Sequence, residues 1–242
     1  MQASREDLLR EVPLYTPAAA ARFTGASQID VRRWVEGYSF RGKWQDPVSE
    51  PARRAADGTI YLTFHHLIEV WTIRRMRQGP DGSKGLSLQA VREAAQAARE
   101  LFQTSFPLAD ERLAWDGAGI FYDIAGAEAV DAGLVELSRH KGQYTWSEFI
   151  RDGLKRIQYR NHQAIRLWPL GRDRLVVLDP SIRNGWPTLA RGGRSIGIPA
   201  DVVAEMVEAG DSPSEVAASY EVEARAVADA LAFVETWSGK AA

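Results

Sequence analysis

The stretch from Tyr15 to Tyr38, YTPAAAARFTGASQIDVRRWVEGY, decides how the front of the chain folds. Thr16 and the proline after it predict a helix start, because a hydroxyl caps free N–H groups and proline fits the first helical position. Gly25 permits the positive φ of a tight turn, and Ser27 predicts the cap of a second helix. The stretch therefore predicts two short helices joined by a turn, a unit found both in DNA-binding proteins and in ordinary helical hairpins.

The composition is that of a folded protein. The 242 residues are 45% hydrophobic, 26% charged and 10% aromatic, which suits one large domain or a few small ones. There is no cysteine, so disulfides, thiol nucleophiles and sulfur-ligated metals are excluded. The sequence has no run approaching the ~20 apolar residues of a membrane span, and its N-terminus is too polar for a secretory signal. We expect a cytoplasmic protein with no membrane partner.

Charge is unevenly distributed along the chain. Residues 1–104 carry 15 basic and 12 acidic side chains, residues 105–178 carry 10 of each, and residues 179–242 carry 5 basic and 10 acidic. A mildly basic front and an acidic back indicate an anionic partner at one end and a different partner at the other. We expect three units with these same bounds: a front unit, a mixed middle region and a helical back unit.

The front unit continues with a loop expected at 39–51. The Asp57-Gly58 pair then predicts a hairpin turn that leads into a strand at 59–64. A helix is predicted over 64–78, with arginines near its C-terminus, where cations suit the helix dipole. Ser87 predicts the cap of a further helix.

The middle and back units mix strands and helices. A hairpin is predicted around Asp116-Gly117, and an amphipathic helix that opens with a capping box is predicted over 145–159. A second hairpin is expected over 164–180, followed by a loop at 181–199 and then three short helices. The predicted fold class is α+β, mainly α, with a small mixed α/β middle region and a C-terminal three-helix domain.

The second helix of the opening stretch has polar groups that suit a helix that reads DNA. Ser27, Gln28, Asp30 and Arg33 are expected to reach base edges or phosphates. The apolar positions of the same helix are expected to pack on the first helix, and they are Ile29, Val31 and Val35.

The order of elements from Leu14 to Phe102 resembles the MerR-type winged helix-turn-helix. The resemblance rests on the Tyr-Thr-Pro lead-in, the two helices, the basic ARR, the Asp-Gly turn with its strand, the helix ending in RRMRQ, and the helix beginning GLSL. It implies that Arg32 clamps the DNA backbone and that Arg53 and Arg54 lie beside phosphates at the wing. The loop at 39–51 and the GPDGSKG segment are both longer than the family pattern. The expected DNA contacts are Thr16, Ser27, Gln28, Asp30, Arg32, Arg33, Arg53 and Arg54.

The back unit resembles the small helical domain of a VapB-type antitoxin class. With the MerR-like front, this likeness extends over nearly the whole chain. It implies a PIN-fold ribonuclease toxin as partner and repression of the promoter that the two genes share. The residues that carry it are Asp179-Pro180, Gly185, Pro187, Gly192, Arg194, Gly210, Ser212, Glu215, Ala217, Tyr220 and Phe233.

Two partners follow from this interpretation. Two-fold symmetry predicts a homodimer on a palindromic site in double-stranded DNA, the chain's own promoter. The middle and back units are expected to bind the toxin and to hold the dimer together. Arg183, Arg191 and Arg194 are candidates for toxin or dimer contact, because they lie in an expected loop.

No catalytic, metal or cofactor site is predicted. His65 and His66 are adjacent, point about 100° apart on a helix, and lack partners at ligand spacing, so we expect them at a helix start near DNA or solvent. No nucleophile–base pair is recognisable, which argues against an enzyme.

An alternative function stays open. The chain would then be a MerR-type transcription regulator whose middle region senses a small molecule, with no toxin partner. The eight tryptophans of the chain are compatible with a ligand pocket, but core positions are the simpler account, above all for Trp34 and Trp71.

Overall fold

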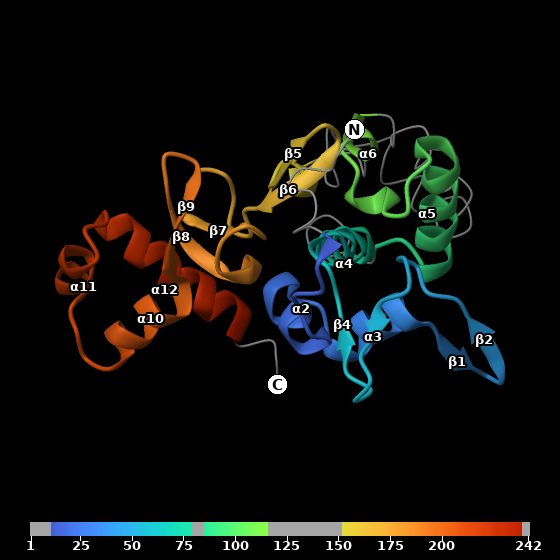
Figure 1. Cartoon of the computed structure of the whole chain (residues 1–242), viewed down its shortest axis with the longest axis horizontal. Helices are drawn as coiled ribbons and strands as arrows, with labels where there is room; N and C mark the ends of the chain where they lie inside the picture. Colours follow the sequence, from blue (N-terminus) through green and yellow to red (C-terminus); the bar gives the residue numbers. More distant parts are fainter. Residues whose placement is uncertain (1–10, 79–84, 116–151, 239–242) are drawn as a thin grey trace, which may run out of the picture.

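The computed structural model describes residues 11–78, 85–115 and 152–238. Within these ranges the chain is a mixed α/β protein with eight α-helices and a five-stranded sheet. The front helices lie at one end of an elongated molecule, and the last three helices lie at the other (Figure 1). No helix in the described ranges is long and apolar enough to cross a membrane.

Local capping sets the first two described helices, as predicted. α2 (Pro17–Thr24) begins after Thr16, whose hydroxyl accepts a hydrogen bond from an N–H of the first turn, and it ends at Gly25 with φ 69°. α3 (Gln28–Glu36) begins after Ser27, whose hydroxyl caps it in the same way. The two helices contact each other across the turn.

A small hairpin follows α3 directly. β1 (Tyr38–Phe40) pairs antiparallel with β2 (Lys43–Gln45), so the loop expected at 39–51 is wrong in its first part. The turn between the strands is Arg41-Gly42, which is a weaker hairpin signal than Asn-Gly or Asp-Gly. Two strands of three residues each leave little periodicity for the sequence to reveal.

The second hairpin is the one that the sequence predicts. β3 (Arg53–Arg54) pairs antiparallel with β4 (Ile60–Tyr61) around the Asp57-Gly58 turn. Beyond β4, the Leu62 N–H donates to the carbonyl of Tyr15 at 2.7 Å, and the Tyr15 N–H donates to the carbonyl of Leu62 at 3.0 Å. The lead-in to α2 is therefore bound to this hairpin.

The centre of the front half is α4 (Phe64–Arg77), most of which is buried. α5 (Leu88–Phe102) begins after its predicted cap, Ser87, and buries its alanine-rich face. Trp34 and Trp71 are both buried, as predicted for core residues.

His65 and His66 are buried, so the expectation that they lie near DNA or solvent is wrong. The His66 ring accepts the N–H of Thr63 at 3.2 Å on one nitrogen and lies 2.9 Å from the carbonyl oxygen of Glu50 on the other. Burial lowers the pKa of His66 to about 4. Both imidazoles pack on the ring of Phe106. Both rings are therefore part of the core at the start of α4, and His66 is neutral there at pH 7.

The segment that connects α5 to the sheet differs from the prediction. A short 3-10 helix, η2 (Pro107–Ala109), precedes α6 (Arg112–Trp115), so the first residues of the hairpin expected around 116–117 are helical. The rest of that hairpin lies outside the described residues, as do the first seven residues of the helix expected over 145–159. Residues 152–154 are helical, as predicted. The final residues of that helix belong instead to a strand, because pairing with the next strand outweighs the local helical pattern.

The sheet is an antiparallel meander whose strands lie side by side in sequence order. The hairpin expected over 164–180 is present, whereas the loop expected at 181–199 contains two paired strands joined by Gly192-Gly193. The sheet also runs across residue 178, where the sequence suggested a boundary between units. The strands are β5 (Ile157–Arg160), β6 (Gln163–Leu167), β7 (Val176–Leu178), β8 (Pro187–Arg191) and β9 (Arg194–Pro199).

Three helices follow the sheet. The last of them is fastened to the sheet by the buried carboxylate of Asp229, which accepts the N–H of Leu175 at 2.8 Å and pairs with the Nε of Arg174 at 3.1 Å. The helices are α10 (Ala200–Glu208), α11 (Pro213–Ser219) and α12 (Ala224–Ser238), and they contact one another.

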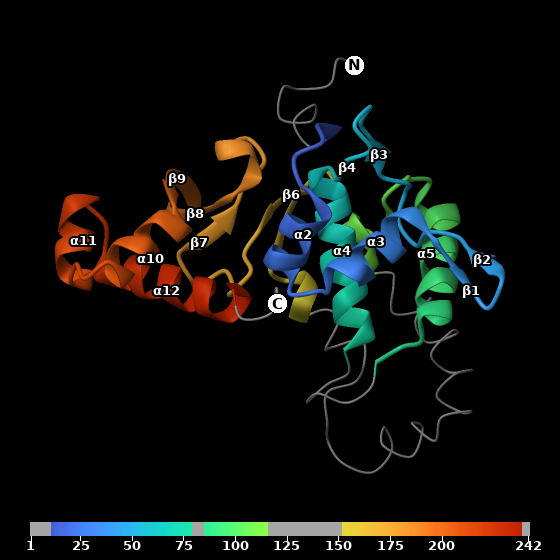
Figure 2. The same cartoon turned by 90° about the horizontal axis from the view of Figure 1, so that it is seen from below.

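Tyr15 links the front half of the chain to the back half. Its ring is fully buried, and its hydroxyl donates a 3.1 Å hydrogen bond to the carbonyl of Gly185. Phe23 of α2 lies edge-on to Tyr15, with ring centroids 6.1 Å apart, and edge-on to Trp186, with centroids 5.2 Å apart. α2 also contacts α12, and Figure 2 shows the two side by side. The front and back of the sequence therefore share one core.

Gly185→Ala is expected to destabilise the protein. Gly185 has a φ of +74°, and a methyl group there would lie 1.9 Å from the Tyr15 hydroxyl. Displacing the buried phenol breaks its hydrogen bond, so the free energy of unfolding should fall by about 2–4 kcal/mol in urea denaturation. Gly192→Ala is the control, since Gly192 has a φ of +57° and nothing within 4 Å. Equal losses in the two variants would contradict the role of the Tyr15 contact.

Glu69 is a buried acid in the middle of α4. Its carboxylate accepts the N–H of Leu108 at 3.0 Å and the hydroxyl of Ser49. Burial raises the pKa of Glu69 to about 7, and the two hydrogen bonds oppose that rise. The Glu69 carboxyl group therefore binds its proton more tightly in the folded protein than in the unfolded chain.

Wild-type protein should lose stability between about pH 4.5 and pH 7, because folding has to bury an increasingly ionised Glu69. Glu69→Gln keeps the side-chain shape and cannot ionise. Its free energy of unfolding, relative to wild type, should therefore rise by up to about 3 kcal/mol across that range. Urea denaturation at several pH values measures this difference. The exposed Glu93→Gln is the control, and a difference for Glu69→Gln that does not change with pH would refute the assignment.

Candidate nucleic-acid interface

The outer side of α3 is exposed at Gln28, Ile29, Arg32 and Arg33. Two of its three apolar positions, Val31 and Val35, are buried as predicted. Ile29 is instead 64% exposed, so the expectation that it packs on α2 is wrong. It lies in the first turn, beside the exposed Gln28, and adds an apolar group to the outer side of the helix.

Three of the predicted contact residues serve as helix caps or cap partners. The Ser27 hydroxyl accepts the N–H of Asp30 at 3.0 Å and donates to its carboxylate at 2.8 Å. The Thr16 hydroxyl accepts the N–H of Ala19 at 3.2 Å and is half-buried. Ser27 lies at the exposed start of α3 and lines a hollow together with Arg33, whereas Thr16 lies at the start of the other helix.

Glu36 connects the end of α3 to the β3–β4 hairpin. One of its oxygens lies 3.7 Å from a guanidinium nitrogen of Arg32, and the other pairs with Arg54. The Arg54 side chain also donates to the carbonyl of Gly58 at 2.9 Å, across its own turn. Arg53 is exposed beside it in β3. The structure therefore brings two predicted arginines, Arg32 and Arg54, to one carboxylate. Arg53 precedes Arg54 in β3, so its side chain points to the other face of the strand.

Arg33 faces the start of α3 and the β1–β2 hairpin. It lies 3.9 Å from the carboxylate of Asp30 and 5.2 Å from the ring centroid of Tyr38. A hollow of about 370 Å³ beside it is also lined by Arg74 and Arg77 of α4. Burial lowers the pKa of Arg74, against the effect of Asp30. The sequence did not single out these two arginines as contacts, because a cation near a helix C-terminus is explained by the helix dipole alone.

The three candidate arginines of the back unit lie elsewhere. Arg183 is exposed in the 3-10 helix η3 (Arg183–Gly185), between β7 and β8. Arg191 and Arg194 flank the turn of the β8–β9 hairpin, and Arg191 donates to the carbonyl of Glu221. All three belong to the half of the molecule away from α3 (Figure 1). They therefore form a set apart from the arginines around Glu36.

The Asp179-Pro180 pair is buried at the end of β7. The Asp179 carboxylate accepts the Nε–H of Arg166 at 2.5 Å and the N–H of Ser181 at 3.0 Å. These hydrogen bonds hold the start of the segment between β7 and β8, which contains Arg183 and Gly185. Asp179 is thus a structural residue of the sheet.

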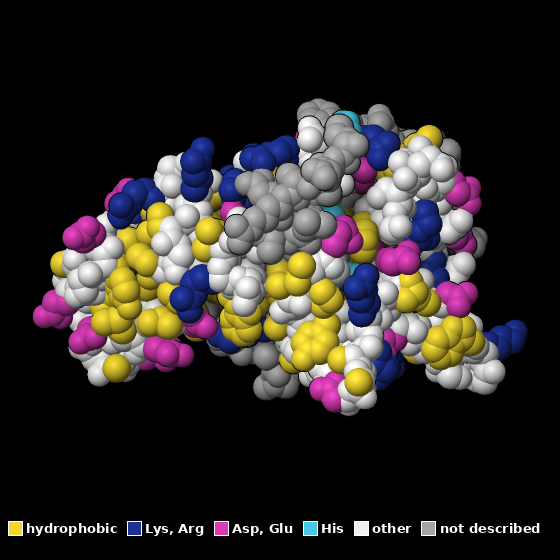
Figure 3. Space-filling view, viewed as in Figure 1, with side chains coloured by type: hydrophobic (Ala, Val, Ile, Leu, Met, Phe, Trp, Pro, Cys, Tyr) yellow, Lys and Arg dark blue, Asp and Glu magenta, His cyan; other side chains and the backbone are white. Residues whose placement is uncertain are grey.

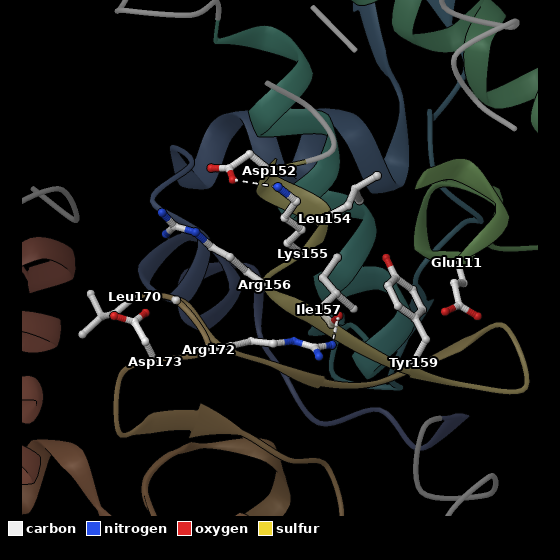
Figure 4. Close-up of a pocket in the computed structure, with 11 residues that line it drawn as sticks. Glu111, Asp152, Leu154, Lys155, Arg156, Ile157, Tyr159, Leu170, Arg172 and Asp173 are labelled. Carbon is white, nitrogen blue, oxygen red and sulfur yellow. Dashed lines mark hydrogen bonds and ion pairs between the residues drawn. The ribbon is translucent and has the colours of Figure 1, made fainter. Parts of the chain in front are cut away.

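A cavity of about 760 Å³ lies beside β5, in the middle of the molecule (Figure 4). Three acidic and three basic side chains line it, together with Leu154, Ile157 and Tyr159. The Tyr159 hydroxyl is buried and has no hydrogen-bond partner in the part of the chain that is described. No group of three histidine or carboxylate side chains in the described ranges is placed to hold a metal ion.

Part of the chain matches a known protein family. Residues 176–234 match the family described as "Protein of unknown function (DUF433)". The matched segment begins in β7 and ends within α12, so it includes the β8–β9 hairpin as well as the three helices.

A named protein and a solved structure, both from Mycobacterium tuberculosis, resemble the chain over most of its length. The protein named "Putative antitoxin VapB45", of strain ATCC 25618 / H37Rv, is 27% identical over 240 residues, which cover 93% of this chain and 95% of that protein. A crystal structure of Rv2018 has a TM-score of 0.64 at 20% identity, covering 91% of this chain and 98% of that one. At that identity the second likeness concerns the fold alone.

Proposed function

We propose that this protein is a DNA-binding antitoxin that neutralises a PIN-fold ribonuclease toxin and represses its own promoter. The observation that carries the DNA-binding half is the exposed, arginine-bearing side of α3 beside the β3–β4 hairpin. The antitoxin half is supported by the relative that is named as an antitoxin and that matches nearly the full length of the chain. The protein acts by binding and not by catalysis.

In this proposal the front half is a winged helix-turn-helix. α3 enters the major groove, where Gln28, Arg32 and Arg33 meet base edges or phosphates. The β3–β4 hairpin is the wing, and its Arg53 and Arg54 lie along the DNA backbone. Glu36 holds Arg32 and Arg54 in position before binding, and phosphates then replace the carboxylate as their partner, as is usual for charge-assisted hydrogen bonds to DNA.

The bound form is a homodimer on a palindromic operator. Each chain places one α3 in the major groove, and the two-fold axis of the dimer relates two half-sites about one helical turn apart. The toxin binds to the back half, and the dimer contact also lies there. The acidic balance of residues 179–242 keeps this half away from phosphates.

The toxin is inactivated through its metal site. A PIN-fold ribonuclease holds metal with a cluster of carboxylates, so an arginine placed at the mouth of that site blocks it. Arg183, Arg191 and Arg194 are exposed on one half of this chain, away from α3, and are the candidates for that role. DNA and toxin then bind to different halves of one molecule.

Arg32→Ala and Arg54→Ala should each weaken binding to a fragment from upstream of the gene. Loss of one phosphate contact should reduce affinity roughly tenfold and make the slope of log K against log salt less negative by about 0.9. Gel shift or fluorescence anisotropy at several salt concentrations measures both. Arg225→Ala is the control, because its side chain is 54% exposed, close to the 57% of Arg54, but lies on α12. Unchanged affinity in Arg32→Ala would remove that residue from the interface.

Co-expression with the neighbouring reading frame tests the toxin half. A stable complex in pull-down and size exclusion, with the neighbour's ribonuclease activity suppressed, is the expected result. Arg183, Arg191 and Arg194 are then changed to glutamine singly, and at least one variant should release active toxin. An active neighbour that never binds this chain would contradict the antitoxin role.

A second candidate function rests on the cavity beside β5. Its volume of about 760 Å³ suits a small molecule, and the acidic and basic side chains that line it offer polar groups to such a molecule (Figure 4). The chain would then be a MerR-type regulator that senses this molecule and has no toxin partner. A chain that shifts its promoter fragment but purifies alone favours this candidate.

A further inference from the structure

The β1–β2 hairpin follows the end of α3 and carries two large side chains that are more than half exposed. The ring centroid of one of them, Phe40, lies 5.3 Å from the guanidinium of Arg41. Phe40 is 55% exposed and Trp44 is 62% exposed. The strand register places Phe40 opposite Lys43 and Trp44 opposite Ser39, so the two aromatic rings lie on opposite faces of the ribbon. Hydrophobic and basic side chains are visible together at this end of the molecule (Figure 3).

The base of this hairpin is held firmly. The Tyr38 ring lies between two guanidinium groups, 5.2 Å from Arg33 and 5.7 Å from Arg92. Arg92 also donates from Nε to the carbonyl of Asp46 at 3.0 Å, just beyond β2. The indole N–H of Trp44 donates to the Asp46 carboxylate at 3.0 Å. α3 and α5 therefore fix the direction in which the ribbon projects.

The tip of the hairpin is occupied by an arginine at a costly position. Arg41 has a φ of 51° and Gly42 a φ of 75°, so both residues of this two-residue turn are left-handed. Asparagine or glycine is preferred at the first of these positions, and a longer side chain there is strained. Strained residues of this kind concentrate at functional sites. Here the strain places a cation at the outermost point of the ribbon.

Charge and placement favour DNA over a protein partner. Residues 37–45 contain Arg41 and Lys43 and no acidic side chain. α3 lies between the β1–β2 and β3–β4 hairpins in both views (Figures 1 and 2). A helix in the major groove brings the flanking segments of its own domain to the sugar–phosphate backbone.

We propose that the β1–β2 hairpin is a second wing, which binds the DNA backbone on the side of α3 opposite the β3–β4 hairpin. Arg41 and Lys43 contact phosphates, and the exposed aromatic rings lie against the sugars beside them. This inference rests on the proposed DNA-binding function. It extends the DNA segment that each chain covers beyond the base pairs that α3 reads.

The test is the double variant Arg41→Asn/Lys43→Gln. Asparagine tolerates the left-handed turn position, so the hairpin should fold at least as well while losing both charges. With the promoter fragment, the slope of log K against log salt should become less negative by about 1.8 for each bound chain. Hydroxyl-radical footprinting should show lost protection on the flank of the site and unchanged protection where α3 binds.

The matched control is Arg160→Gln/Arg225→Gln. It removes the same charge from two exposed positions in β5 and α12, which the proposed function assigns to no interface, and it should leave the slope and the footprint unchanged. A wild-type slope in the Arg41→Asn/Lys43→Gln variant would overturn the second wing while leaving the DNA-binding proposal intact. So would a variant that binds DNA normally but no longer binds the product of the neighbouring reading frame, which would make the hairpin a protein contact. Failure of the wild-type chain to bind the fragment would overturn both proposals.

Discussion

The buried hydroxyl of Tyr15 is the contact on which the arrangement of the molecule depends. The main chain of Tyr15 is bound to Leu62 at the end of the β3–β4 hairpin, and its side chain is bound to Gly185, far away in the sequence. A phenol in an apolar core needs a hydrogen-bond partner, and here that partner is the backbone carbonyl of Gly185. Because Gly185 has no side chain, the connection between β7 and β8 can come close enough to provide that partner. The hydrogen bond between Tyr15 and Gly185 therefore sets the orientation of α3 relative to the sheet.

Acidic side chains organise the basic surface of the front half. Glu36 lies between Arg32 and Arg54, and Asp30 lies beside Arg33. Exposed ion pairs of this kind add little to stability. Their effect is to hold long, flexible arginines in a few orientations, which lowers the entropy lost when an anion binds. In the proposed DNA-binding function, a phosphate replaces the carboxylate at each arginine, so affinity and specificity would depend on the acids as well as on the bases.

The elements that the sequence predicted well are those that depend on neighbouring residues. The starts of α2, α3 and α5 follow from hydroxyl caps, and the β3–β4 hairpin follows from its Asp-Gly turn. The β1–β2 hairpin was missed because strands of three residues are too short to show a periodicity. The β8–β9 hairpin was missed because four consecutive residues of β8 are buried, so the strand lacks an alternation of buried and exposed positions. The strand β5 was missed because a helical pattern extends into it, and only pairing with β6 decides its conformation. Of the predicted interface, the caps were located correctly, while Ile29 was assigned to the wrong side of its helix.

The sequence by itself determined where α2, α3, α4 and α5 begin, and where the β3–β4 hairpin turns. These properties rest on capping, turn chemistry and the spacing of apolar residues, all of which act within a few positions of the chain. Only the tertiary structure decided that Glu36 joins α3 to the β3–β4 hairpin, that His65 and His66 are buried, and that the sheet runs across residue 178. Each of these features depends on contacts between groups that are distant in the sequence. Such contacts form only when the chain packs, so the local sequence does not predict them.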